Sequence, residues 1–378
     1  MANIHGISRF GSDTPEMGTV FAVAMHLCDR SKQGGGAMAT MTAAVRDDGA
    51  RPILWWAALG ALFAGFQIYL FAAWIASDQF APIAPGPDPL PDGSRLVMMG
   101  LWIGFGLSAL AGIGWVLATL LRGRPLNLIQ LLIIGCGFCL WQDPTVNLLR
   151  PVAMYNTHYL NFGSWAEQIP WWFSPNGHRN GQPLAFQSAL YPIMVPVWVL
   201  TAAAVMAGAK RLWPRLSGPF LALIAVAAIT IGQTGAEVAM VRAEIFAYGG
   251  VIRAASVFAG TRWQFPVYGA FLWAIGTVAI ACLVHWRDDR NRTLVERGIE
   301  RLRIGTATAN LLRALAMTGA ANLAILAYYL SFMVVSLYSD PWPDGFPSYF
   351  MNGICGPGTG YACPDPSLPI PGRLVPPG

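Results

Sequence analysis

The residues best suited to chemistry are acids placed inside long apolar segments of the chain. Glu237, Glu244 and Tyr248 share one such segment, and helical spacing would align both carboxylates and the phenol along a single stripe. Ionisable groups at membrane depth are costly and usually face a cavity or a partner. Two carboxylates in unequal surroundings could act as a general acid and a charge stabiliser. The structural alternative is an internal salt bridge to one of three arginines, namely Arg242, Arg253 or Arg262.

A third acid lies near the end of another apolar segment, in the run Trp141-Gln142-Asp143-Pro144-Thr145-Val146-Asn147. Pro144 fits the first turn of a new helical segment, for which Asp143 would be the N-cap. The run therefore predicts a broken span that offers a carboxylate and free backbone N–H groups to a cavity, with Asn147 close by. A capped kink without a chemical role is the alternative.

The connection formed by residues 150–183 is long and rich in aromatic residues. Loops of this length are often lids or binding loops. His158 could act there as a general acid or base near neutral pH, although a lone loop histidine is more often a hydrogen-bonded surface group. Trp165, together with Arg262 and Trp263 in a later turn, would add binding surface. All of these groups map to one half of the membrane, which predicts a pocket for an amphiphilic organic molecule.

The elements that must position these residues are transmembrane helices. The chain of 378 residues is 55% hydrophobic and only 11% charged, whereas soluble domains carry about 25% charged residues. A helix needs about 20 mostly apolar residues to cross the hydrocarbon core. The segments that qualify are 53–76, 96–121, 126–149, 184–209, 219–248, 265–285 and 309–338. The sequence therefore predicts an all-α integral membrane protein with about seven transmembrane helices.

Basic residues outside these spans gather on one side of the membrane. The excess of arginine on one side predicts an N-terminus inside and a C-terminus outside. The bias towards Arg, Ala and Gly suggests a GC-rich bacterial genome, and we expect a multi-pass protein of a bacterial cytoplasmic membrane. The net charge of +5 is then a signal of orientation and does not indicate nucleic-acid binding. The basic segment 287–305 has apolar residues at helical spacing, which predicts an amphipathic helix resting on the lipids of the inner leaflet.

Three regions follow from this arrangement. Residues 1–50 are predicted to be disordered or to reflect a mis-assigned start, and residues 51–338 form the transmembrane domain. Residues 339–378 form a tail rich in Gly and Pro outside the cytoplasm. Because disulfides persist there, Cys355 and Cys363 are candidates for a bridge.

Several function classes are excluded. Retinal would need a lysine within a span for its Schiff base, but lysine occurs only at Lys32 and Lys210. Di-iron or haem ligation would need histidines inside the spans, and none of the five histidines lies centrally in one. No Gly-rich phosphate loop that ends in Gly-Lys-Ser/Thr occurs, which argues against ATP-driven work. The sequence predicts no metal site.

The order of several sequence blocks resembles the AveC-like spirocyclase family of actinobacterial membrane proteins. The resemblance spans roughly residues 50–375 and is strongest from Trp141 to Gly298. The blocks are Trp141-Gln142-Asp143-Pro144, Asn161 to Trp165, Ser174-Pro175-Asn176-Gly177, Trp263-Gln264-Phe265-Pro266, Arg287-Asp288-Asp289-Arg290 and Glu296-Arg297-Gly298. The family is named for a member associated with spiroketal formation and dehydration in a macrolide pathway, and it supplies no settled catalytic set.

The resemblance implies a cyclase or dehydratase that acts on a lipophilic hydroxy-ketone, either polyketide-like or lipid-like. Such chemistry needs a general acid, a base and negative charge near an oxocarbenium-like centre, and it needs no cofactor. In this interpretation Glu237 is the acid and Glu244 the ionised stabiliser. Asp143 or His158 is the base, and Tyr248 orients the substrate. The alternative function is a transporter or binding carrier for a lipophilic small molecule, since buried acids and broken helices also serve transport.

Overall fold

The computed structural model describes residues 51–368. The predicted N-terminal segment 1–50 therefore lies outside the described residues, as does the end of the tail. Six described helices are long and apolar enough to cross a membrane, and a bent helix pair can supply a seventh span. The chain is thus an all-α multi-pass membrane protein, which confirms the fold class predicted from composition.

The spans occur close to their predicted positions. Five are single helices: α2 (Pro52–Ile75), α3 (Asp92–Leu121), α7 (Gly218–Arg242), α8 (Val267–His285) and α9 (Thr306–Ser336). A sixth contains α5 (Leu184–Ala189), the π-helical turn η5 (Leu190–Met194) and α6 (Val195–Leu212). The bent pair consists of α4 (Leu128–Gly137) and the 3-10 helix η2 (Leu140–Asn147), which meet at 43°. Pro192 lies inside η5 and lacks a backbone N–H, which accounts for the wider turn there.

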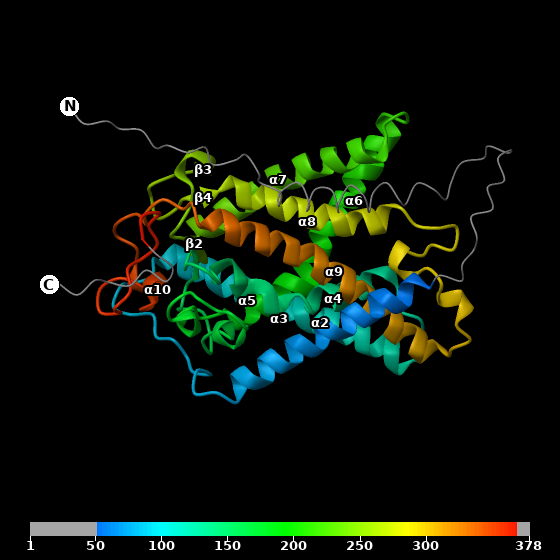
Figure 1. Cartoon of the computed structure of the whole chain (residues 1–378), viewed down its shortest axis with the longest axis horizontal. Helices are drawn as coiled ribbons and strands as arrows, with labels where there is room; N and C mark the ends of the chain where they lie inside the picture. The colour runs from blue at the N-terminus through cyan, green and yellow to red at the C-terminus, as the bar shows by residue number, and fades with distance from the viewer. Residues whose placement is uncertain (1–50, 369–378) are drawn as a thin grey trace, which may run out of the picture.

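Helix α8 forms the centre of the bundle, with α6, α7 and α9 against it (Figure 1). Helix α2 lies along α9 at very close range. A Cβ atom added to Gly60 would lie 1.8 Å from the carbonyl oxygen of Leu315, and one added to Gly319 would lie 2.4 Å from that of Trp56. Small residues allow such backbone contact between membrane helices. Helix α3 lies at the outside, and its exposed leucines and isoleucines suit contact with lipid.

The two ends of the bundle differ. At one end, β1 (Ala153–Tyr155) pairs with β2 (Phe246–Tyr248), and β3 (Ser256–Val257) pairs with β4 (Phe265–Pro266). Helix α10 (Ser348–Met351) lies at this end too, which we call the strand end (Figure 1). The opposite end, which we call the arginine end, consists of residues 122–127 and 286–305. It includes the 3-10 turns η7 (Leu294–Glu296) and η8 (Ile299–Arg301).

Three further 3-10 turns interrupt the loops, namely η3 (Ala166–Gln168), η4 (Gly177–Arg179) and η6 (Arg253–Ala255). The C-terminal segment returns to the strand end after α9. Cys355 and Cys363 are joined there by a disulfide. Arg150 donates hydrogen bonds to the carbonyl oxygens of Asp365 and Leu368, at 2.9 and 2.8 Å, and so ties this segment to the loop after η2.

The fifth span is shorter than predicted. Helix α7 ends at Arg242, Glu244 adopts a left-handed φ of 60°, and the chain then enters strand β2. The aromatic Phe246 and Tyr248 favour the extended conformation, and pairing with β1 satisfies their backbone groups. The prediction that Glu237, Glu244 and Tyr248 share one helical stripe is therefore wrong.

The basic segment 287–305 is not the predicted amphipathic helix. It folds into the two short turns η7 and η8, separated by Gly298 at a left-handed φ of 90°. Thr293 caps η7 through a reciprocal pair of hydrogen bonds with Glu296. Glu296 is buried and is also paired with Arg313 of α9, so polar contacts within the protein replace the expected contact with a lipid surface.

Candidate active site

A cavity at the strand end collects residues from η2, η5, α7, α8, α9 and the β1–β2 pair. It contains about 700 Å³ of space not occupied by atoms, part of which opens to the surroundings. Aromatic and aliphatic side chains form most of its wall, among them Phe186, Phe246, Trp273 and Tyr328. Two acids, Asp143 and Glu237, also line it. An apolar cavity with a few polar groups is the usual form of a small-molecule site.

Asp143 is the more buried of the two acids and accepts hydrogen bonds from neutral groups. Its Oδ1 accepts from the hydroxyls of Tyr155 at 3.1 Å, Tyr191 at 2.9 Å and Tyr329 at 3.4 Å. Its Oδ2 accepts from the side-chain amide of Gln187 at 2.9 Å. Tyr191 and Tyr329 also hydrogen-bond each other. Each hydroxyl has one proton, so when Tyr329 donates to Tyr191, the phenols that donate to Asp143 are Tyr155 and Tyr191. A carboxyl group from the broken span is thus held by side chains from β1 and from two other spans.

The break in the third span brings Asp143 to the cavity. Helix α4 ends at Gly137, and Asp143 lies inside the following 3-10 helix, whose N-cap is Cys139. The predicted break is present, but the predicted N-cap role of Asp143 is wrong, because the new segment begins before Pro144. Asn322 of α9 fixes this segment by accepting hydrogen bonds from the indole of Trp141 at 2.9 Å and the side-chain amide of Gln142 at 2.8 Å.

Glu237 lies in the last two turns of α7 and lines the same cavity. Its Oε1 accepts a hydrogen bond from the side-chain amide of Gln233 at 2.6 Å, and its Oε2 accepts one from the hydroxyl of Tyr248 at 2.8 Å. Tyr248 reaches Glu237 from strand β2. Gln264 holds that strand by donating to the carbonyl oxygens of Tyr248 at 3.0 Å and Gly249 at 2.8 Å.

Both acids have only neutral hydrogen-bond partners. Within residues 51–368, neither Asp143 nor Glu237 forms an ion pair with Arg, Lys or His. Burial raises the pKa of Tyr155 and of Tyr248 well above the usual value, and the nearby charges of Asp143 and Glu237 respectively add to the shift. Both phenols therefore stay protonated as donors. Carboxyl groups without a fixed counter-charge can give up and take on protons.

Two cavity-lining groups have a buried polar atom without a protein partner in the described part of the chain: Gln233, through Oε1, and Trp273, through Nε1. Buried polar atoms normally have a hydrogen-bond partner. A polar ligand in the cavity would supply an acceptor for the indole N–H and a donor for the amide oxygen. These two atoms extend the polar surface beyond the acids.

Asn147 lines the cavity as predicted, but its side chain is already engaged. Its Oδ1 accepts from the backbone N–H groups of Val152 at 2.8 Å and Ala153 at 2.9 Å, and its Nδ2 donates to the carbonyl oxygen of Ala153 at 2.8 Å. These bonds connect the end of η2 to the start of β1. Asn147 thereby helps to position Tyr155, two residues further along the strand.

Glu244 lies outside the cavity lining, in a separate polar contact. Its carboxylate pairs with Arg262 at 2.8 Å and accepts a hydrogen bond from the hydroxyl of Tyr349 in α10. The guanidinium of Arg262 also lies over the ring of Trp263, 4.7 Å from its centroid. Glu244, Arg262 and Trp263 thus hold loops of the strand end together, and the salt bridge to Arg262 is the structural alternative raised from the sequence. Glu244 does not share a site with Glu237.

His158 and Trp165 are also outside the cavity lining. The ring of His158 packs against Tyr349, with centroids 5.2 Å apart, and burial lowers the pKa of this histidine. Trp165 packs against Phe71 and Trp74 of α2, and its indole donates to the carbonyl oxygen of Trp141 at 2.9 Å. Trp165 therefore connects the bent span to α2 and lies outside the cavity.

Sequence reasoning missed the phenols and amides that hold the acids, namely Tyr155, Tyr191, Tyr329, Gln187 and Gln233. Tyr191 and Tyr329 lie in spans, where an isolated phenol has no periodic signature. The residue type alone gave a signal, because the hydroxyl of a buried tyrosine usually has a hydrogen-bond partner and could have been expected to reach an acid. Within the described residues, no group of three or more His, Cys, Asp or Glu side chains could hold a metal ion.

Comparisons with known proteins identify one matching family. The profile of one family, described as "Spirocyclase AveC-like", matches residues 123–352. That range contains Asp143, Glu237 and all the side chains that hydrogen-bond to them. No curated protein and no solved structure matches the chain significantly. Because the match covers more than half of the chain, the chain belongs to the AveC-like spirocyclase family, which supports a spirocyclase-type role.

Proposed function

We propose that this member of the AveC-like spirocyclase family closes or dehydrates a lipophilic hydroxy-ketone by acid–base catalysis in the cavity at the strand end. The observation that carries the proposal is the presence of two carboxyl groups, Asp143 and Glu237, in one largely apolar cavity with neutral hydrogen-bond donors. General acid–base catalysis by positioned groups typically contributes about 10²–10⁴-fold to a rate.

Glu237 is the general acid. A substrate hydroxyl first adds to the ketone and gives a hemiketal. Glu237 then donates its proton to the hemiketal hydroxyl, the C–O bond breaks, and one water leaves behind an oxocarbenium ion. Both acids face the apolar wall formed by Trp273 and Tyr328, where a low dielectric disfavours a carboxylate. Glu237 has fewer hydrogen-bond donors than Asp143 to offset this cost, which favours the uncharged form of Glu237 before transfer.

Asp143 is the base and the anionic stabiliser. Its two phenol donors and one amide donor suit a carboxylate, since hydrogen bonds to a charged group are stronger than those to a neutral one. The carboxylate stabilises the developing cation and takes the proton of the second hydroxyl as that oxygen attacks. The product is a spiroketal plus one water. If the cation loses a neighbouring C–H proton to Asp143 instead, the product is an enol ether.

The roles of Tyr248 and Tyr155 are to orient the two acids and the substrate oxygens. Each lies in the β1–β2 pair, so the register of the two strands fixes the positions of both phenols. The sequence analysis gave Glu244 the role of the anion that stabilises the cation, and this role is now assigned to Asp143. His158 has no part in the reaction.

The test begins with deletion of the gene in its native host and complementation with wild type or Glu237→Gln. Untargeted mass spectrometry then compares cell and medium extracts. A species that loses one water, or changes retention at constant mass, only when wild type is present supports the proposal. An unchanged molecule that moves between cells and medium supports a transporter, and equal rescue by Glu237→Gln contradicts the catalytic assignment.

A further inference from the structure

Two aromatic side chains of the cavity at the strand end carry hydrogen-bond donors that no described protein group accepts. Trp273 of α8 and Tyr328 of α9 line the cavity and are 7% and 8% exposed. Within residues 51–368, the indole N–H of Trp273 has no acceptor and the hydroxyl of Tyr328 forms no hydrogen bond. Their rings are apolar, but each side chain also offers one donor. Because buried polar atoms normally have a partner, the two donors point to a ligand.

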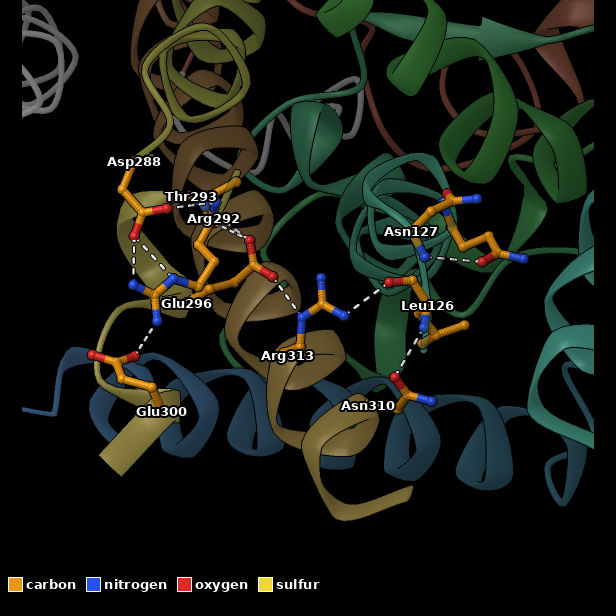
Figure 2. Close-up of polar contacts among 10 residues, drawn as sticks. Leu126, Asn127, Asp288, Arg292, Thr293, Glu296, Glu300, Asn310 and Arg313 are labelled. Atoms are coloured by element: carbon orange, nitrogen blue, oxygen red, sulfur yellow. Dashed lines mark hydrogen bonds and ion pairs between the residues drawn. The ribbon is translucent and has the colours of Figure 1, made fainter. Parts of the chain in front are cut away.

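Buried polar side chains at the arginine end are satisfied by the protein itself. Asn310 accepts a hydrogen bond from the backbone N–H of Leu126 at 2.9 Å and donates one to the carbonyl oxygen of Arg124 at 2.9 Å. Glu296 caps η7 and pairs with Arg313 at 2.6 Å (Figure 2). The free donors of the cavity contrast with this arrangement.

Trp273 and Tyr328 lie against each other on neighbouring helices. Their ring centroids are 5.1 Å apart, and the ring planes meet at 81°. Tyr328 also packs edge-on against Tyr329, with centroids 4.7 Å apart, and against Phe332, with centroids 6.0 Å apart. These contacts fix the ring of Tyr328 before any ligand binds, which lowers the entropic cost of binding.

The unused groups of the cavity lie near its acids. The charges of Glu237 and Asp143 both act on the hydroxyl of Tyr328. The side-chain amide of Gln233 donates to Glu237 at 2.6 Å, and its oxygen has no partner in the described part of the chain. The free groups are thus two donors and one acceptor. Since a carbonyl oxygen can accept two hydrogen bonds and a hydroxyl can donate one, this set is complementary to a hydroxy-ketone.

We propose that Trp273 and Tyr328 bind the ketone oxygen of the substrate, with Tyr328 as the main donor. This inference rests on the proposed function, because it assigns side chains to the first step, in which a hydroxyl adds to the ketone. Two fixed donors at an oxygen that gains negative charge form an oxyanion hole. The same oxygen later leaves as water.

The atoms of the addition step balance without a co-reactant. A C–O bond forms from the attacking hydroxyl, and the electron pair of the C=O bond moves onto the oxygen held by Tyr328. That oxygen receives a proton from Glu237, and Asp143 takes the proton of the attacking hydroxyl. One proton then returns from Asp143 to Glu237. The hemiketal therefore contains the atoms of the open substrate, and both acids are restored for the loss of water.

The test uses nonan-5-one labelled with carbon-13 at its carbonyl, a ketone without hydroxyls that cannot cyclise. It is added to the full-length protein in detergent micelles. Carbon-13 NMR detects hydrogen bonds to the ketone because they move its carbonyl signal downfield, and wild type should show this displacement relative to empty micelles. Tyr328→Phe should lose roughly half of the displacement, because it removes one of two donors. Trp273→Phe is the second variant and should lose a comparable part.

The matched control is Tyr159→Phe. The hydroxyl of Tyr159 is also buried and without a partner among the described residues, but Tyr159 does not line the cavity. The control should keep the carbonyl signal of wild type. Tyr159→Phe and Tyr328→Phe should both keep the unfolding midpoint of wild type, since neither hydroxyl has a hydrogen bond within the protein to lose.

The outcomes separate this inference from the proposed function. With the substrate identified from cell extracts, Tyr328→Phe should lower turnover roughly tenfold, because it removes a hydrogen bond to an oxygen on which charge develops. Equal carbonyl signals in wild type and Tyr328→Phe would overturn the inference, and so would a wild-type signal identical to that in empty micelles. A displaced signal that depends on Tyr328, in a protein that converts no substrate, would support the ketone site and overturn the proposed function.

Discussion

The two cavity acids and the acids at the arginine end are held in opposite ways. At the strand end, Asp143 accepts hydrogen bonds from phenols and an amide, and Glu237 from a phenol and an amide. At the arginine end, Glu296 is paired with Arg313, and Asp288 with Arg292. Asp143 and Glu296 are similarly buried, at 5% and 1% exposure. Burial alone therefore does not distinguish a reactive acid from a structural one.

The difference lies in the charge of the partner. A carboxylate beside a guanidinium is stabilised as an anion, and removing either partner leaves an unpaired charge. A carboxyl group held by neutral donors keeps both protonation states accessible and can transfer a proton to a ligand. We therefore expect substitutions of the cavity acids to affect turnover, and substitutions of the ion-paired acids at the arginine end to affect stability. The four predictions that follow test this separation.

The largest effect is expected at the two cavity acids. Glu237→Gln and Asp143→Asn should each lower turnover by roughly 10²–10⁴-fold, since each removes a proton donor or acceptor and preserves the shape of the side chain. Conversion of the substrate found by mass spectrometry, measured in membranes with equal protein content, checks this. The matched control is Glu300→Gln, which should retain turnover. Equal activities in all three variants would contradict the claim that the cavity acids take part in the reaction and Glu300 does not.

Glu296→Gln should act on stability and leave turnover per folded molecule unchanged. Breaking a buried ion pair by removing one partner costs about 3 kcal/mol or more, because Arg313 stays behind without its counter-charge. Thermal unfolding in detergent should show a clear fall in the midpoint. A double-mutant cycle with Arg313→Gln should show coupling, because the second change removes the unpaired charge. Strictly additive losses would contradict the pairing argument.

A smaller effect is expected from single phenols. Tyr248→Phe removes the hydrogen bond that stabilises the carboxylate formed as Glu237 gives up its proton. Turnover should fall about tenfold, because a hydrogen bond to a charged group contributes about 1.5–3 kcal/mol. Tyr349→Phe removes the corresponding bond to Glu244, whose charge is matched by Arg262, and should change turnover by less than about twofold. Comparable losses in the two variants would place Glu244 in the reaction after all.

The smallest effect concerns pH. Burial would raise the pKa of Asp288, but its hydrogen bonds and ion pair with Arg292 outweigh this and hold the pKa below the usual value. The stabilisation by this pair is complete above the ordinary carboxyl pKa and is lost as the pH falls through the lowered folded value. Asp288→Asn should reduce the acid-induced loss of stability by about 0.5 kcal/mol, the size of a partly exposed ion pair. Unfolding midpoints near neutral pH and below pH 4 give the comparison, and an unchanged pH dependence would contradict it.

Much of the fold follows from the sequence because the spans are set by the length of apolar segments. The bent third span was also predictable, since Pro144 follows Asp143 within an apolar run. Of the residues selected from the sequence, Asp143, Asn147, Glu237 and Tyr248 line one cavity. Each is a polar group near or inside a span, where a polar side chain without a partner or a function would cost free energy.

The errors arose where tertiary contacts override local pattern. The apolar residues after Arg242 continue a helical pattern, but the left-handed turn at Glu244 and the pairing with β1 end the helix. The same holds for 287–305, where Gly298 and the buried Glu296 replace a helix by two turns. The phenols around Asp143 come from three separate segments, and no local spacing could have joined them.

The contact between Gly60 and Gly319 defines the smallest piece of the chain that should be produced on its own. The family match begins at residue 123 and so omits α2, although the backbone of α2 touches α9 inside the matched range. A fragment that starts at 123 would leave the surface around Gly319 without its partner, and lipid tails fill such a narrow backbone groove poorly. Expression boundaries for members of this family should therefore be drawn to include the helix that lies before the matched sequence.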